Sequence, residues 1–212
     1  MTRLTGQKKA APAAFFLAAR IAACFHFQRY LPCFETGTAC SRSSYNISIN
    51  RIEARNASTG EQKALLIGLG GGSVAKFIYH RMPWVQVRAI ELRERVLTVA
   101  RRYFQLPEND ERLEVIIGDG AEFASRPQVC TDILMVDGYD GESHAEALST
   151  TAFYRDCHDR LNKGGLLVVN LWGGDREFHD TLKRIEAAFP GGTLCLPAER
   201  PGNVIVFGFR TS

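Results

Sequence analysis

The chain has 212 residues, of which 45% are hydrophobic and 23% charged, as is ordinary for a globular protein that buries a core and shapes a cleft. Its net charge of +3 is too small to indicate nucleic-acid or membrane binding through the general electrostatic field. No stretch reaches the roughly 18 apolar residues of a membrane span. The six cysteines form no Cys-x-x-Cys pair, which favours reduced thiols over disulfides or a metal site. We therefore expect a cytoplasmic protein without a resident metal.

The pattern of the chain changes near residue 60. Residues 1–60 form a divergent segment, in which 45–54 alternate as a strand or half of a β-hairpin would. Residues 61–212 form the expected ligand-binding domain, in which short apolar runs alternate with helical patterns. The expected strands are 64–67, 85–90, 113–117, 132–136, 166–171, 193–196 and 204–209. The expected helices are 74–81, 93–104, 150–161 and 176–189.

This alternation predicts an α/β fold with a doubly wound, mostly parallel sheet of the Rossmann or methyltransferase type. The last two strands are close together in the sequence and predict a C-terminal antiparallel hairpin. Within the helix 93–104, Val96, Val99, Ala100 and Tyr103 have the spacing of a core-facing stripe. In an open sheet of this kind, ligands bind beyond the carboxyl ends of the strands, so the residues at those ends are the candidates for a site.

The ends of the first two strands carry residues suited to a nucleoside. Gly68, Gly70 and Gly72 follow the first strand, where glycine permits a tight turn and lets a ligand approach a helix N-terminus. Ser73 departs from the dinucleotide pattern G-x-G-x-x-G, which disfavours a dehydrogenase. Glu91 ends the second strand, where a carboxylate can accept hydrogen bonds from both ribose hydroxyls. The alternative for Glu91 is a solvated acid at the start of a helix.

The next two strand ends carry further acidic residues. Asp119, followed by Gly120, can accept a hydrogen bond from an adenine amino group or cap the next helix, and both alternatives remain open. Asp137 and Asp140 flank Tyr139 three residues apart after the fourth strand. One carboxylate could hold an ammonium group while the other takes a proton from an attacking amine. A surface acidic turn is the alternative interpretation.

Together these residues resemble the spermidine synthases, or polyamine aminopropyltransferases, over roughly residues 45–171. The glycine loop resembles the first motif of that family, Glu91 its ribose-binding acid and Asp119 its adenine-contacting acid. Asp137 and Asp140 resemble its D-x-x-D pair. In that pair the first aspartate is taken as the base and the second as a contact to the transferred group. The resemblance therefore assigns Asp137 and Asp140 to the reaction centre.

Further positions are similar to substrate-contacting parts of the same family. The segment 145–148 resembles the gatekeeping segment, so the resemblance implies substrate contacts for Glu146 and for Tyr139 nearby. Tyr45 resembles a tyrosine of the N-terminal β-domain and is also expected to contact substrate. Two departures stand out. The glycine loop lacks the aspartate with which the family commonly holds the amine end of the donor, and Gly141 follows the D-x-x-D pair where proline is usual.

The resemblance implies aminopropyl transfer from decarboxylated S-adenosylmethionine, as co-substrate, to a diamine such as putrescine in polyamine biosynthesis. It implies no permanently bound cofactor, a small polyamine substrate and neither nucleic-acid nor membrane partners, with a homodimer left open. Two other functions also remain open. One is an S-adenosylmethionine-dependent methyltransferase, because the loop lacks the donor-binding aspartate. The other is a degenerate, non-catalytic nucleoside-binding domain.

Overall fold

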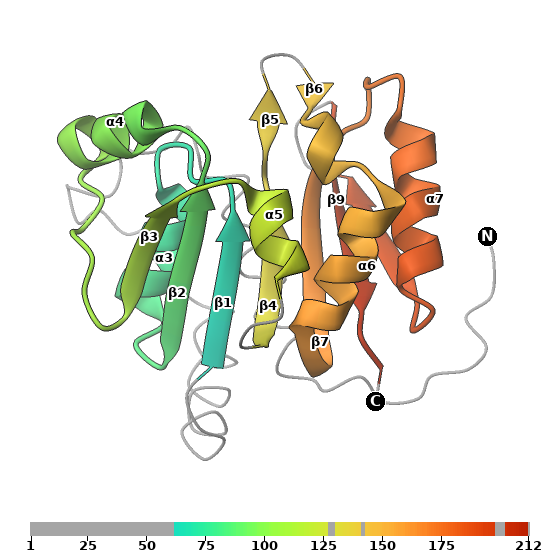
Figure 1. Ribbon diagram of the computed structural model, residues 1–212, viewed down its shortest axis with the longest axis horizontal. Helices are drawn as coiled ribbons and strands as arrows, with labels where there is room; N and C mark the ends of the chain where they lie inside the picture. Colours follow the sequence, from blue (N-terminus) through green and yellow to red (C-terminus); the bar gives the residue numbers. More distant parts are fainter. Residues whose placement is uncertain (1–61, 127–129, 141–142, 198–201, 212) are drawn as a thin grey trace, which may run out of the picture.

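A computed structural model describes residues 62–126, 130–140, 143–197 and 202–211 (Figure 1). The predicted N-terminal segment, residues 1–60, lies outside this described part. Within the described part, no helix is both long enough and apolar enough to cross a lipid bilayer. The described residues form a twisted sheet between two layers of helices, so the predicted doubly wound arrangement is confirmed (Figure 1).

Seven strands of the described chain form one sheet in the order β3-β2-β1-β4-β7-β9-β8. The parallel strands are β1 (Gln62–Ile67), β2 (Val85–Glu91), β3 (Leu113–Ile117), β4 (Thr131–Val136) and β7 (Leu161–Trp172). The antiparallel strands at one edge are β8 (Thr193–Pro197) and β9 (Asn203–Phe209). The predicted C-terminal hairpin is therefore confirmed, and β9 attaches it to β7.

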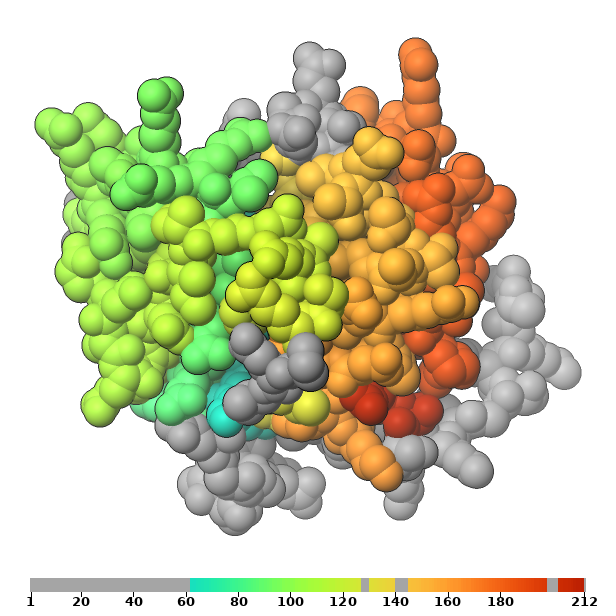
Figure 2. All heavy atoms as spheres, in the orientation of Figure 1, coloured from blue at the N-terminus to red at the C-terminus, as the bar shows by residue number. Residues whose placement is uncertain are grey.

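Helices cover both faces of the sheet, as its apolar strands require. On one face, the core includes residues of α3 (Ser73–Arg81) and α4 (Glu94–Phe104). On the other, it includes residues of α5 (Gly120–Ser125), α6 (Thr151–Arg160) and α7 (Phe178–Ala188). Figure 2 shows α5 and α6 as a continuous layer of atoms in front of the sheet.

Strand β1 shows why a continuous apolar run forms a central strand. Ala64 and Leu66 belong to the core on the α3 side, whereas Leu65 and Ile67 belong to the core on the α6 side. Successive side chains of a strand point to opposite faces, so a strand buried on both faces must be apolar throughout. All four of these residues are buried, which explains why the run could be identified from the sequence.

The predicted core-facing stripe of α4 is confirmed at Ala100 and wrong at Val99 and Tyr103. Ala100 is buried, but Val99 and Tyr103 are 44% and 66% exposed. Leu97 is partly buried and packs against the core cluster that contains Ala100, whereas Val96 borders the pocket described below. The helix contacts β2, the strand next to the edge strand β3, so only a narrow strip of its surface is buried.

The order of the strands places a crevice at the upper edge of the sheet. The chain proceeds from β1 outward to β2 and β3, then returns to the other side of β1 to form β4 and β7. Such a reversal separates the loops that leave neighbouring strands and opens a ligand crevice at their carboxyl ends. A short hairpin of β5 (Tyr139–Asp140) and β6 (Ser143–His144), followed by the 3₁₀ helix η3 (Glu146–Leu148), lies above this edge (Figure 1).

Candidate active site

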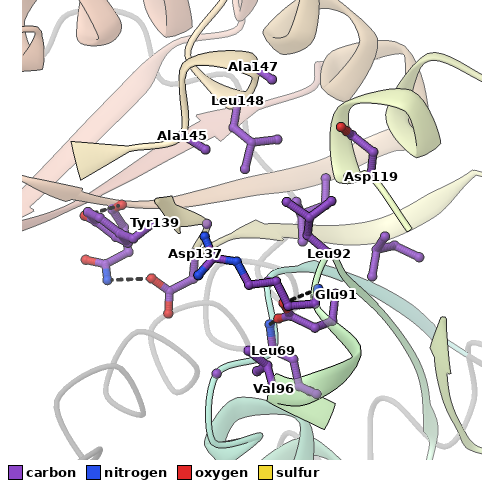
Figure 3. Close-up of a pocket in the computed structure, with 18 of the residues that line it drawn as sticks. Leu69, Glu91, Leu92, Val96, Asp119, Asp137, Tyr139, Ala145, Ala147 and Leu148 are labelled. Atoms are coloured by element: carbon purple, nitrogen blue, oxygen red, sulfur yellow. Dashed lines mark hydrogen bonds between the residues drawn. The ribbon is translucent and has the colours of Figure 1, made fainter. Parts of the chain in front are cut away.

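A cavity of about 530 Å³ lies at the carboxyl ends of β1, β2 and β4 (Figure 3). It has acidic groups, bare glycine backbone and apolar side chains on its walls. The predicted residues on its walls are Gly68, Gly70, Glu91, Asp119, Gly120, Asp137 and Tyr139. Ile67, Ile90, Leu92 and Leu148 supply apolar contact surface. A cavity with apolar walls and a few convergent polar groups is typical of a small-molecule site.

The glycine loop between β1 and α3 lets the backbone form one wall of this pocket. Gly68 and Gly70 have φ angles of 96° and 54°, which residues with a side chain rarely adopt. A Cβ atom at Gly68 would lie 2.3 Å from the carbonyl oxygen of Asp137. Glycine at this position therefore allows the loop to pass directly beside the end of β4.

Glu91 joins the glycine loop to the start of α4. Its Oε2 accepts a hydrogen bond from the backbone N–H of Leu69, and its Oε1 accepts one from that of Arg93, both at 3.0 Å. The residue is only 8% exposed, and it lines the pocket. Each carboxylate oxygen can accept more than one hydrogen bond, so Glu91 can hold the loop and also accept bonds from a ligand.

Asp119 caps helix α5, which was one of the two alternatives for this residue. Its Oδ1 accepts hydrogen bonds from the backbone N–H groups of Ala121 and Glu122, at 2.7 and 3.1 Å. Asp119 also lines the pocket, as does Gly120, where a Cβ atom would lie 2.3 Å from Ile67 Cγ2. Capping and ligand binding are therefore compatible, because both capping bonds use the same carboxylate oxygen.

Asp137 and its neighbours form the polar centre of the pocket (Figure 3). Asn170 Nδ2 donates a hydrogen bond to Asp137 Oδ1 at 2.9 Å. Desolvation by the surrounding protein raises the pKa of the Asp137 carboxyl, and the bond from Asn170 partly opposes this effect. Burial also raises the pKa of Tyr139, whose hydroxyl donates to the carbonyl oxygen of Asn170 at 3.0 Å. The arrangement places a carboxyl group of increased basicity against the cavity.

The remaining predicted site residues lie elsewhere or cannot be placed. Gly72 has a φ of 71° and precedes α3 as its N-cap, where a Cβ atom would contact the side chain of Leu106. Glu146 begins η3 and is exposed, outside the residues that line the pocket. The backbone of Asp140 pairs with that of Ser143 in the short hairpin, but its side chain is outside the described part, as is Tyr45.

Several pocket residues were missed as site candidates. Asn170 and Trp172 come from the end of β7, and Asn203 comes from the start of β9. Trp172 lines the pocket and is 44% exposed. Strand β7 was identified, so its polar end could have been included on the same grounds as the end of β4. No sequence pattern indicates that β9 returns to the same edge.

An α/β fold of this kind, with an acid-lined pocket at the switch point of its sheet, defines a domain of the methyltransferase-like class. The spermine/spermidine synthase domain matches residues 52–194. The chain therefore belongs to the spermine/spermidine synthase family, as the motifs indicated. The match begins within the predicted N-terminal segment and ends before β9.

Comparisons with individual proteins agree with this assignment. The chain is 40% identical over 146 residues to a polyamine aminopropyltransferase of Neisseria meningitidis, an alignment that covers 69% of the chain and 56% of that relative. It thus spans little more than half the length of that curated relative. Human methyltransferase-like protein 13 in complex with SAH superposes with a TM-score of 0.63 at 26% identity, covering 70% of this chain and 71% of that one.

A spermidine synthase in complex with the transition-state analogue AdoDATO has the same fold. It superposes with a TM-score of 0.60 at 23% identity, over 72% of this chain and 56% of that one. The fold is thus common to a spermidine synthase and a methyltransferase-like protein, and a fold by itself does not determine the reaction.

Proposed function

We propose that this protein transfers the aminopropyl group of decarboxylated S-adenosylmethionine to a diamine such as putrescine. The observation that carries the proposal is the desolvated Asp137 carboxyl, which borders the cavity and is held by Asn170. The family to which the chain belongs and its polyamine aminopropyltransferase relatives support this reaction over others on the same fold.

The proposed reaction needs a base for the acceptor amine. An aliphatic amine has a pKa of about 10.4 in water and reaches the protein protonated. Asp137 removes one proton, and the amine nitrogen then attacks the aminopropyl carbon that is bonded to the sulfonium sulfur. The carbon–sulfur bond breaks, its electron pair goes to sulfur, and methylthioadenosine leaves as a neutral thioether. Raising the pKa of Asp137 brings it closer to that of the amine, which makes this proton transfer less unfavourable.

The donor nucleoside is proposed to lie across the glycine loop. Glu91 would accept hydrogen bonds from the ribose hydroxyls, and Asp119 Oδ2 would accept one from the adenine amino group. Gly68 and Gly70 would let the donor lie against bare backbone. The apolar walls of the pocket would pack against the base and help exclude water.

The acceptor is proposed to enter beside the short β5–β6 hairpin. Asp140, Tyr139 and Glu146 are the residues proposed to contact the diamine, together with Tyr45. Negative charge at this entrance would attract a dication and position its far ammonium group. This chain spans 56% of the Neisseria meningitidis relative, so the acceptor named here is proposed and not taken from that protein.

The decisive test is the identity of the nucleoside product. The protein would be incubated with decarboxylated or intact S-adenosylmethionine and a panel of diamines, and the products would be analysed by mass spectrometry. We expect methylthioadenosine that requires both the decarboxylated donor and a diamine. Asp137→Asn should abolish it while methylthioadenosine binding stays nearly unchanged. Asp132→Asn is the matched control, because Asp132 lies on β4, the strand that Asp137 follows, and also accepts a bond from an asparagine, Asn162 at 2.7 Å.

Other outcomes would identify the competing functions. S-adenosylhomocysteine formed from the intact donor would identify a methyltransferase, a result that the likeness to methyltransferase-like protein 13 makes worth testing. Nucleoside binding without turnover of either donor would identify a non-catalytic binding domain. Turnover that survives Asp137→Asn would refute the assignment of the base.

A further inference from the structure

Three polar side chains form a continuous hydrogen-bonded row that begins on the edge hairpin and ends at the pocket. Asn203 Nδ2 donates to Asn170 Oδ1 at 3.0 Å, and Asn170 Nδ2 donates to Asp137 Oδ1 at 2.9 Å. All three residues line the cavity, and Asn170 is only 7% exposed. The row thus connects strand β9, which lies beyond the region matched by the family, to the acidic centre of the site.

The pairing of β7 with β9 places Asn203 within reach of Asn170. Trp172 is the direct partner of Asn203, and Asn170 is the direct partner of Ile205. Asn170 and Asn203 are therefore diagonal neighbours on one face of an antiparallel pair, which is close enough for side-chain contact. The two asparagines are thus held on ordered strands.

The direction of the two hydrogen bonds affects which protonation state of the Asp137 carboxyl is stabilised. An asparagine amide has one donating end and one accepting end, so the partner at one end determines which end faces the other way. Asn203 donates to the oxygen of Asn170 and so directs the Asn170 NH₂ group at Asp137. If the amide turned over, its oxygen would face Asp137 and could bond only to a protonated carboxyl. The ionised carboxylate, which is the form that can accept a proton, would then lose its partner.

We propose that Asn203 is a positioning residue, which fixes the orientation of the Asn170 amide and so holds Asp137 as an ionised proton acceptor. The expected effect of Asn203 on turnover rests on the proposed function. Its effect on the Asn170 amide and on the titration of Asp137 can be measured without turnover. Loss of Asn203 should favour the protonated form of Asp137 and shift the acid limb of activity to higher pH. The plateau at high pH should be retained, because Asp137 is ionised there in either case.

The test compares Asn203→Leu with the unaltered full chain. Leucine is similar to asparagine in size and has no polar atom, so the strand pairing of residue 203 is kept while the donor is lost. We expect kcat/KM to fall about threefold to tenfold on the acid limb, the effect of one net hydrogen bond. Carboxyl carbon NMR of the aspartates, with Asp137 assigned from Asp137→Asn, should show an upward change in the pKa of Asp137.

Two further variants keep the result interpretable. Asn203→Ala also removes the donor and should change the titration of Asp137 in the same direction, which covers the case in which Asn203→Leu does not fold. Asn162 lies at the opposite end of β7 from Asn170 and donates a hydrogen bond to Asp132. Asn162→Leu removes this bond and should leave the titration of Asp137 unchanged. A titration of Asp137 that is unaltered in folded Asn203 variants would overturn the proposal. If the titration moves but no methylthioadenosine is formed by the unaltered chain, the positioning role stands and the proposed function fails.

Discussion

Replacing Gly68 by alanine tests whether the glycine loop and the end of β4 are packed as the structure shows. Gly68 has a φ of 96°, so any side chain there is strained. In addition, a Cβ atom would lie 2.3 Å from the carbonyl oxygen of Asp137 and 2.8 Å from its carbonyl carbon. Both of these atoms are backbone, so the new methyl group cannot be accommodated by rotation of a side chain.

A matched variant separates the two contributions to the stability lost by Gly68→Ala, which are backbone strain and overpacking. Gly164 has a φ of 78°, but a Cβ atom there would meet no other residue within 4 Å in the described part of the chain. Gly164→Ala should therefore lose about 1–2 kcal/mol of stability from backbone strain alone. Gly68→Ala should lose roughly 2–5 kcal/mol, because the cost of overpacking, about 1–3 kcal/mol, adds to the strain.

Urea denaturation of the two variants measures this difference directly. Calorimetric titration with methylthioadenosine provides a second measurement, and we expect weaker binding by Gly68→Ala alone, because the end of β4 must move away from the loop. If the two variants lose equal stability and bind equally well, the close approach of the loop to Asp137 is refuted.

Three other predictions concern the acidic residues of the pocket. Glu91→Gln should lower stability by about 1–3 kcal/mol, because one amide oxygen cannot replace both bonds to Leu69 and Arg93; unchanged denaturation would contradict this. Asp119→Ala should cost about 0.5–2 kcal/mol through loss of the helix cap, whereas Asp119→Ser should retain the cap and lose only the ligand contact. Nucleoside binding that is equally strong in Asp119→Ser and the unaltered chain would argue against the adenine role. Finally, burial raises the pKa of Asp137 in the folded state, so the stability of the unaltered chain should decline as pH rises through that pKa. Asp137→Asn lacks this titration and should gain stability relative to the unaltered chain as pH rises. A difference in unfolding free energy between the two proteins that is independent of pH would be evidence against the raised pKa.

The sequence was informative where one physical rule determines both structure and composition. A strand buried on both faces must be apolar throughout, which made β1 and β4 recognisable. Parallel strands bring their carboxyl ends to one edge, so Glu91, Asp119 and Asp137 could be assigned to a single pocket before their contacts were known. The capping by Asp119 was also anticipated as one of two alternatives.

The sequence was less informative where long-range packing decides the outcome. Asn203 reaches the pocket only because β9 pairs with β7 in antiparallel register, and no local pattern encodes that register. The stripe of α4 was misplaced because Val99 and Tyr103 satisfy helical periodicity equally well, and only the position of the helix over the sheet decides which side is covered. The β5–β6 hairpin has two residues in each strand, too few for a periodic signal.

The participation of β9 in the pocket has a consequence for how the proposed reaction centre is lost and restored. The β8–β9 hairpin joins the rest of the sheet only through the pairing of β9 with β7, so we expect the hairpin to open as a unit more readily than a central strand. Each such opening would separate Asn203 from Asn170 while leaving Glu91 and Asp119 in place. Amide exchange on β9 would then report the fraction of molecules in which the proposed nucleoside contacts remain but the bond from Asn203 to Asn170 is broken.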